Sequence, residues 1–159
     1  MWDKNISWAR IKYYIEPLKQ TGCPALFYGD LQVLGKTSLA KVISNTTKYK
    51  FSRLNAVTSG IQDIKDKIAE AKNIMLNPTG KCILFIDEIH RFNKLQQDAL
   101  LPFVEDGTVI LIGATTENPY FEVNKALLSR SMVFKLNPLT GDEIYQILKN
   151  ALKQEDRLR

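Results

Sequence analysis

Two adjacent acidic residues, Asp87 and Glu88, follow four apolar residues, Ile83–Ile86, in the segment KCILFIDEIHRF. A short apolar run without alternation is typical of a strand buried on both faces, as in parallel sheets. Carboxylates at the carboxyl end of such a strand would lie where α/β sheets bind their ligands. There Asp87 could hold a magnesium ion, directly or through water, and Glu88 could orient a water molecule. A strand that ends in a solvated acidic turn is the alternative, and this pattern alone does not separate the two.

A second candidate site follows a predicted strand at Ala25–Tyr28. Gly29 and a loop lead from this strand to the segment Gly35–Ser38, GKTS, which opens a predicted helix. This order is that of a phosphate-binding P-loop, in which backbone N–H groups of the loop and of the helix N-terminus surround the phosphates. In that motif Lys36 would reach the β- and γ-phosphates, and the hydroxyl of Thr37 would bind magnesium.

The spacing of this loop departs from the P-loop motif. The motif has four residues between its glycines, whereas the five residues Asp30–Leu34 separate Gly29 from Gly35, and none of them is glycine. Val33 is β-branched and resists the positive φ that such loops commonly require. Asp30 would repel a polyphosphate by about 3 kcal/mol at about 5 Å and an effective dielectric of about 20, roughly a hundredfold in affinity. Taken literally, this loop should bind ATP poorly or not at all.

Composition and charge limit the possible classes of protein. With 159 residues, 45% hydrophobic and 25% charged, the chain is expected to form one soluble globular domain. No apolar run approaches the roughly 20 residues of a membrane span, and the N-terminus does not resemble a signal peptide. Two cysteines are too few for a disulfide framework or a metal cage, so a reducing cytoplasm is the expected location. A net charge of +5 permits binding to a polyanion without demonstrating it.

Predicted strands alternate with predicted helices, which favours a three-layer α/β sandwich around a mostly parallel, five-stranded sheet. The predicted strands are Ala25–Tyr28, Lys48–Asn55, the run that starts at Lys81, Thr108–Ile112 and Met132–Leu136. The predicted helices are Ile11–Lys19, Thr37–Asn45, Ile61–Met75 with Ser59 as its cap, 94–105 with Leu95, Ala99, Leu100 and Val104 facing inward, Asn124–Ser129, and a last one from Thr140 through Leu152. If the strands at 83–86 and 108–112 are neighbours, Thr116 and Asn118 would lie beside the two acids.

Four segments resemble AAA+ ATPases, and within them the replication-associated recombination ATPases (the RarA/MgsA group), relatives of the Werner-helicase-interacting ATPase. They are LNAVTSGIQDIK, ILFIDEIHRFNKLQQDALLPFVEDGT, LIGATTENPYFEVNKALLSRS and LNPLTGDEI, and they cover most of Phe27–Leu152. The resemblance implies an αβα P-loop NTPase core at 25–137, after a poorly matched segment at 1–24. It also implies that 138–159 is the start of a helical lid, and that the rest of the lid and a C-terminal oligomerisation domain are absent.

The resemblance implies roles for individual residues. Asp87 and Thr37 would bind magnesium, and Glu88 would polarise the attacking water. Asn118 resembles the sensor 1 residue, which contacts the γ-phosphate or that water. Arg130, in the sequence SRS, resembles an arginine finger offered to the ATP of a neighbouring subunit, so that activity would require oligomers. The positions implied to bind the nucleotide are Gly29, Gly35, Lys36, Thr37, Ser38 and Asp87.

Two of these polar residues also have plain structural interpretations. Asn118 precedes Pro119 and suits a turn, and Arg130 would be favoured near a helix C-terminus by the helix dipole. Without the resemblance, these structural interpretations are favoured for both. His90, the only histidine, is interpreted as a surface or interface residue and not a metal ligand, because the sequence offers it no partner ligands.

The implied function is magnesium-dependent ATP hydrolysis on DNA at stalled replication forks and single-strand/duplex junctions. Expected partners are DNA and replication proteins such as single-strand-binding protein, with no membrane. The expected location is the cytoplasm, at the nucleoid in a bacterium, or the nucleus in a eukaryote. One alternative is a nucleotide-incompetent fragment that serves only as an interaction module. Another is a different AAA+ role, such as clamp loading or branch migration. Whether this chain is an enzyme stays open because of its altered loop.

The altered loop has a testable origin. The family sequence there is Gly-Pro-Pro-Gly-Thr-Gly-Lys-Thr. The nucleotide string CCTCCAGGTACTGG encodes Pro-Pro-Gly-Thr-Gly in one frame. Preceded by GA and shifted, it encodes Asp-Leu-Gln-Val-Leu-Gly, which is the sequence of residues 30–35. We hypothesise a local frameshift, which coding DNA with incompatible codons would exclude. A genuine loop of this sequence would indicate a degenerate ATPase.

Overall fold

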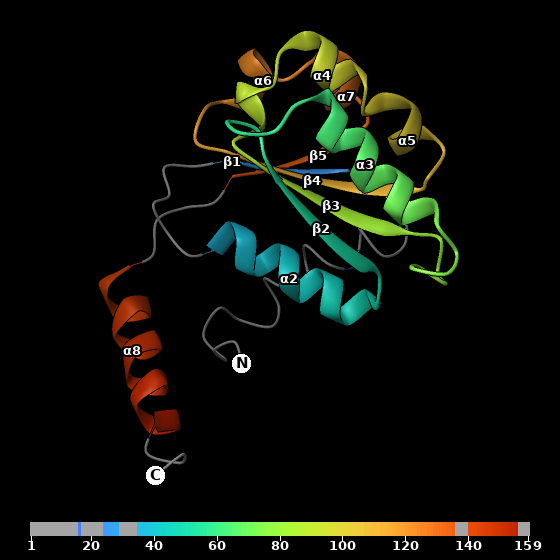
Figure 1. The fold of residues 1–159 in the computed structure, drawn as a ribbon. Coiled ribbons are helices and arrows are strands. Elements are labelled where there is room, and N and C mark those ends of the chain that lie inside the picture. The colour runs from blue at the N-terminus through green and yellow to red at the C-terminus, as the bar shows by residue number, and fades with distance from the viewer. Residues whose placement is uncertain (1–15, 17–23, 29–34, 136–139, 156–159) are drawn as a thin grey trace.

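The computed structural model describes residues 16, 24–28, 35–135 and 140–155, and its centre is a five-stranded sheet (Figure 1). The strand order is β2-β3-β4-β1-β5, and every neighbouring pair is parallel. The strands are β1 (Ala25–Tyr28), β2 (Lys50–Asn55), β3 (Cys82–Asp87), β4 (Val109–Thr115) and β5 (Met132–Lys135). The predicted fold class is therefore confirmed.

Helices cover both faces of the sheet, which gives the three layers. Helix α2 (Gly35–Thr47) lies on one face, and α3 (Ile61–Lys72) lies on the other (Figure 1). The short elements η1 (Ile89–Arg91), α4 (Lys94–Asp98), α5 (Leu101–Glu105), α6 (Pro119–Glu122) and α7 (Lys125–Leu128) follow β3 and β4, and α8 (Gly141–Glu155) follows β5. Within the described residues, no helix is both long enough and apolar enough to cross a membrane.

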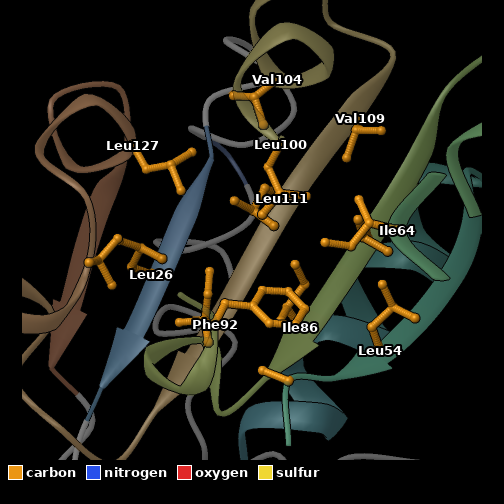
Figure 2. Close-up of a cluster of buried hydrophobic side chains, with 14 of the residues drawn as sticks. Leu26, Leu54, Ile64, Ile86, Phe92, Leu100, Val104, Val109, Leu111 and Leu127 are labelled. Carbon is orange, nitrogen blue, oxygen red and sulfur yellow. The ribbon is translucent and has the colours of Figure 1, made fainter. Parts of the chain in front are cut away.

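The central strand β3 is buried on both faces, as its unbroken apolar run predicts. Its alternate side chains enter two separate hydrophobic clusters. Ile83 and Phe85 pack with Ala40 and Ile43 of α2. Leu84 and Ile86 belong to the larger cluster on the opposite face, together with residues of α3, α5 and α7 (Figure 2). The sheet is thereby fixed from both sides, and the carboxyl ends of its strands share one edge.

Several local predictions need correction. The helix that begins at Ile61 is capped by Gly60 and not by Ser59, because the side chain of Asp63 accepts the Gly60 N–H at 2.7 Å. It ends at Lys72, three residues before the predicted end. The next residue, Asn73, is the C-cap and has an extended conformation. Strand β4 continues to Thr115 and so runs past its predicted end. The helix predicted at Ile11–Lys19 lies outside the described residues, apart from one position.

The helix predicted over 94–105 is divided into α4 and α5. Pro102 lies in the first turn of α5, where its missing N–H is tolerated. In the interior of one continuous helix, the same proline would break the hydrogen-bond pattern. Leu95 is 71% exposed instead of inward-facing, and Gln97 takes the buried position. The Gln97 amide is satisfied there, because it donates to the carbonyl of Phe92 at 3.0 Å and accepts the Asn124 N–H at 2.7 Å.

Candidate functional site

The candidate site lies at the carboxyl edge of the sheet, where β3 and β4 end. The strand pairing places Thr115 of β4 opposite Tyr28 of β1, so the chain that leaves β1 begins at this same edge. It re-enters the described structure at Gly35, the first residue of α2. Lys36 and Thr37 lie in the first turn of α2. In the sheet, β4 lies between β1, which precedes α2, and β3, which ends at the acidic pair.

Asp87 ends β3 with its carboxylate in an ion pair. Arg53 of β2 donates from Nη2 to Asp87 Oδ2 at 3.0 Å, and the Asp87 side chain is 24% exposed. The Arg53 side chain is half exposed, and its guanidinium carbon is 6.0 Å from the centre of the Phe85 ring. An ion pair this exposed typically contributes about 1 kcal/mol or less. A divalent cation can therefore displace Arg53 from Asp87 at little cost.

Glu88 turns the chain away from the sheet in a left-handed conformation, with φ 55° and ψ 43°. A residue other than glycine adopts this conformation at a cost of about 1–2 kcal/mol, and such strain concentrates at functional sites. The Glu88 carboxylate accepts a hydrogen bond from the Thr116 hydroxyl at 3.3 Å. The predicted neighbourhood of the β3 and β4 ends is thus confirmed, and Thr116 is the residue that joins them.

His90 is a member of this group that the sequence interpretation missed. Its side chain is 9% exposed, so the surface alternative of the His90 interpretation is wrong, and the interface alternative stays a prediction. His90 Nδ1 is hydrogen-bonded to Thr115 Oγ1 at 2.7 Å and lies 3.3 Å from Glu88 Oε2. The sequence signal was its position two residues after Glu88, whereas its contact with Thr115 depends on the register of the sheet.

Asn118 caps helix α6. Its Oδ1 accepts the N–H of Tyr120 at 3.1 Å, which confirms the structural interpretation of Asn118 as a turn residue. The cap uses the carbonyl oxygen of the side-chain amide. Its Nδ2 group has two N–H donors, which this cap does not use. The cap and a sensor role are therefore chemically compatible.

Arg130 belongs to a different part of the surface. Its guanidinium donates to the carbonyl of Ala126 at 2.9 Å and forms an ion pair with Glu105 at 2.7 Å. Glu105 ends α5, just before the amino end of β4, whereas Thr116 follows the carboxyl end. The seven residues of β4 extend about 20 Å at ~3.3 Å per residue. The structure therefore places Arg130 and Glu88 toward opposite edges of the sheet.

The described residues fit a nucleotide with magnesium in two respects. Magnesium in such sites is held by one or two carboxylates, with phosphate oxygens and water as the other ligands. Asp87 supplies one partly exposed carboxylate, and the described residues include no cluster of three or more His, Cys, Asp or Glu that would form a protein-only metal cage. The first turn of α2 contains no acidic residue, so its positive end can face phosphate. Gly29 and Asp30–Leu34 lie outside the described residues.

Comparison with known proteins agrees with this geometry. The model of the AAA family, ATPase family associated with various cellular activities, matches residues 25–138. The chain therefore belongs to the AAA family of ATPases. It is 54% identical over 123 residues to replication-associated recombination protein A of Haemophilus influenzae, and 54% identical over 119 residues to ATPase WRNIP1 of Dictyostelium discoideum. The resemblance to the replication-associated recombination ATPases is thus confirmed.

These matches cover most of this chain but a small part of the relatives. They include 77% and 75% of the chain, and 27% and 14% of the two relatives. Among solved structures, the Thermotoga maritima RuvB Holliday junction branch migration motor is similar, with a TM-score of 0.72 and 25% identity over 98% of this chain and 52% of that one. The chain thus spans about a quarter or less of the length of these curated relatives.

Proposed function

We propose that this chain is the nucleotide-hydrolysing module of an AAA ATPase that acts on DNA in replication-associated recombination. The observation that carries the proposal is the arrangement at the carboxyl edge of the sheet. Asp87 and Glu88 end the buried central strand there, and the helix that opens with Lys36 and Thr37 begins beyond the same edge. The similarity to replication-associated recombination protein A supports the cellular context.

In this proposal Asp87 and Glu88 have different roles in hydrolysis. Asp87 and Thr37 hold magnesium, which supplies positive charge to the phosphates when bound. Glu88 orients and polarises the attacking water, and its carboxylate is already fixed through one oxygen by Thr116. Lys36 holds the β- and γ-phosphates, together with the backbone N–H groups of Gly29, Gly35 and Ser38. Asn118 donates from Nδ2 to the γ-phosphate or the water while its Oδ1 caps α6.

Arg130 acts on a neighbouring subunit. Within one subunit it lies toward the edge of the sheet opposite to Glu88, so it serves the ATP of a second copy. Release from Glu105 costs little, because both side chains of the pair are almost half exposed. An arginine supplied in this way increases turnover by roughly 10³–10⁵. The proposed active form is therefore a homo-oligomer.

The proposed substrate structures are stalled forks and single-strand/duplex junctions, and the proposed partners include single-strand-binding protein. The support for DNA is the family and the net charge of +5, which permits attraction to a polyanion. The corresponding location is the cytoplasm at the nucleoid, or the nucleus. The structural similarity to a branch migration motor makes branch migration a competing role.

A second candidate function is that of a nucleotide-incompetent interaction module. The observation that favours it is the sequence of Asp30–Leu34, which lacks glycine and adds an acidic residue to the phosphate-binding loop. Under this alternative the described residues of the two hydrophobic clusters still form the core. The two candidates differ in whether Mg-ATP binds at all.

ATP turnover measured with and without forked DNA tests the first function. The wild-type chain is compared with Glu88→Gln and with Glu70→Gln, a control on the surface of α3. We expect DNA to stimulate turnover, and Glu88→Gln to reduce kcat by a hundredfold or more while Mg-ATP still binds. Wild-type turnover in Glu88→Gln would contradict the assigned chemistry. Absence of Mg-ATP binding in the wild-type chain would favour the interaction module.

A further inference from the structure

The environment of the Glu88 carboxylate is asymmetric. Thr116 Oγ1 and His90 Nδ1 both approach Glu88 Oε2, each at 3.3 Å. Among the described residues, these contacts leave Oε1 as the oxygen that can engage a ligand, and the Glu88 side chain is 29% exposed. One carboxylate oxygen is thus anchored to the protein, and these contacts do not occupy the other.

His90 is itself fixed by the sheet. Its ring is 9% exposed and is hydrogen-bonded through Nδ1 to Thr115, the last residue of β4, which is fully buried. Thr115 is in turn held, because its Oγ1 accepts the N–H of Glu117 at 3.0 Å. A chain of contacts therefore runs from the rigid strand β4, through Thr115 and His90, to Glu88.

The donors and acceptors in this chain of contacts favour a proton on Nδ1 of His90. An ionised carboxylate can only accept hydrogen bonds, so a contact between Glu88 and Nδ1 requires a proton on Nδ1. That proton is then placed between Thr115 Oγ1 at 2.7 Å and Glu88 Oε2 at 3.3 Å. The hydroxyl hydrogen of Thr115 is directed to the carbonyl of Glu117, at 3.4 Å. These contacts are compatible with one another when His90 carries a proton on Nδ1, either in the neutral ring or in the imidazolium.

We propose that His90 is a positioning residue, which holds the Glu88 carboxylate in the orientation that the water-polarising step requires. This inference rests on the proposed function, because it assigns His90 a part in the same reaction. A glutamate side chain loses up to about 2 kcal/mol of rotamer entropy when it is fixed. The ring of His90 and the hydroxyl of Thr116 fix it in advance, so this cost is not added to the barrier. His90 touches neither the phosphates nor the water in this scheme.

The tautomer can be tested without any catalytic reaction. Because His90 is the only histidine, a long-range ¹H–¹⁵N spectrum of the chain reports on this ring alone. We expect a spectrum in which Nδ1 carries a proton. Thr115→Val and Glu88→Gln should both change the Nδ1 signal, and the surface variant Glu70→Gln should not. Ring signals that are the same in all four proteins would overturn the network.

Turnover tests the positioning role. Asparagine can place a donor close to the position of Nδ1, whereas leucine fills the space without one, so His90→Asn and His90→Leu form a matched pair. We expect His90→Leu to lower kcat by ten- to a hundredfold, as displaced catalytic groups do, and His90→Asn to recover part of it. The Kd for Mg-ATP should stay unchanged, and melting temperatures identify any unfolded variant. Thr115→Val, which keeps the ring, should lower kcat in the same direction.

The outcomes separate this inference from the proposed function. If Glu88→Gln removes turnover but His90→Leu leaves kcat unchanged, His90 has no positioning role and the proposed function stands. If the wild-type chain hydrolyses no ATP, the proposed function fails and the catalytic part of His90 fails with it. The NMR result would then still decide whether the ring is held between Glu88 and Thr115.

Discussion

The two halves of the proposed site differ in how closely they follow the motifs they resemble. The acidic half, at the end of β3, keeps its sequence pattern, its burial and a set of contacts to Arg53, Thr116 and His90. The phosphate-binding half keeps Lys36 and Thr37 at the start of α2, but the residues before them add one position and a negative charge. The groups that promote hydrolysis and the groups that bind the nucleotide can therefore be altered by separate substitutions.

Replacement of the loop should have the largest effect. Exchange of Asp30–Leu34 for Pro-Pro-Gly-Thr restores the four-residue spacing and removes the charge of Asp30. The affinity for Mg-ATP should rise by roughly a hundredfold, the value of one carboxylate–phosphate repulsion of about 3 kcal/mol. Calorimetry measures the change, and Asp30→Asn in the original loop isolates the charge from the spacing. An unchanged affinity in the exchanged loop would show that the loop does not limit binding.

The acidic half depends on close packing at Gly113 of β4. A Cβ there would lie 2.6 Å from Leu26 Cδ2 and 3.0 Å from Ile89 Cδ1, and Ile89 belongs to η1 together with His90. Gly113→Ala should lower the free energy of unfolding by about 1–3 kcal/mol and displace η1. Chemical denaturation measures the stability. Gly141→Ala, where an added Cβ meets no other atom, is the control. Equal stability of both variants would contradict the packing argument.

Asn118 allows its two roles to be separated. Asn118→Asp keeps the oxygen that caps α6 but removes the Nδ2 donor, so kcat should fall about tenfold with little loss of stability. Asn118→Ala removes both groups and should also cost about 1 kcal/mol of folding stability, as lost caps do. Turnover and thermal denaturation of the pair measure the two effects. Full activity in Asn118→Asp would leave Asn118 as a cap only.

The smallest effect is expected at Arg53. Its ion pair with Asp87 competes with magnesium, so Arg53→Gln should raise the magnesium affinity of the ATP complex by up to about fivefold, equivalent to about 1 kcal/mol. Titration of magnesium at fixed ATP measures this change. Lys50→Gln, at the start of the same strand and paired with Glu70, is the control. A decrease in affinity would show that Arg53 orients Asp87 and does not compete.

The sequence predicts those features that depend on buried strands and on motif order. The apolar run before Asp87 identified the central strand, and the alternation of elements identified the layers. The sequence prediction joined α4 and α5 into one helix over 94–105. It also placed Leu95 on the inward face, because Leu95 fits the apolar helical period, although its side chain is exposed. The choice between Leu95 and Gln97 depends on partners 25 and 27 residues away, at Glu122 and Asn124. No local pattern contains that information.

The same limit applies to the candidate site. Sequence spacing placed Asp87, Glu88, Thr116 and Asn118 at one edge, because parallel strands end together. It did not reveal that His90 lies between Glu88 and Thr115, since that contact joins η1 to the end of β4, 25 residues further along the chain. Nor did it predict the pairing of Arg53 with Asp87, across β2 and β3. Pairings between strand ends emerge only when the register of the sheet is known.

The central claim is that Lys36 and the acidic pair face one bound triphosphate. Calorimetric titration with Mg-ATP of the wild-type chain, Lys36→Ala and Asp87→Asn tests it most directly, with Lys41→Ala, an exposed residue of the same helix, as the control. We expect saturable binding, weaker than in the loop-exchanged chain, in the wild type and in Lys41→Ala, loss of binding in Lys36→Ala, and loss of the magnesium dependence in Asp87→Asn. Unchanged heats in Lys36→Ala, or no heat in either the wild-type or the loop-exchanged chain, would contradict the claim.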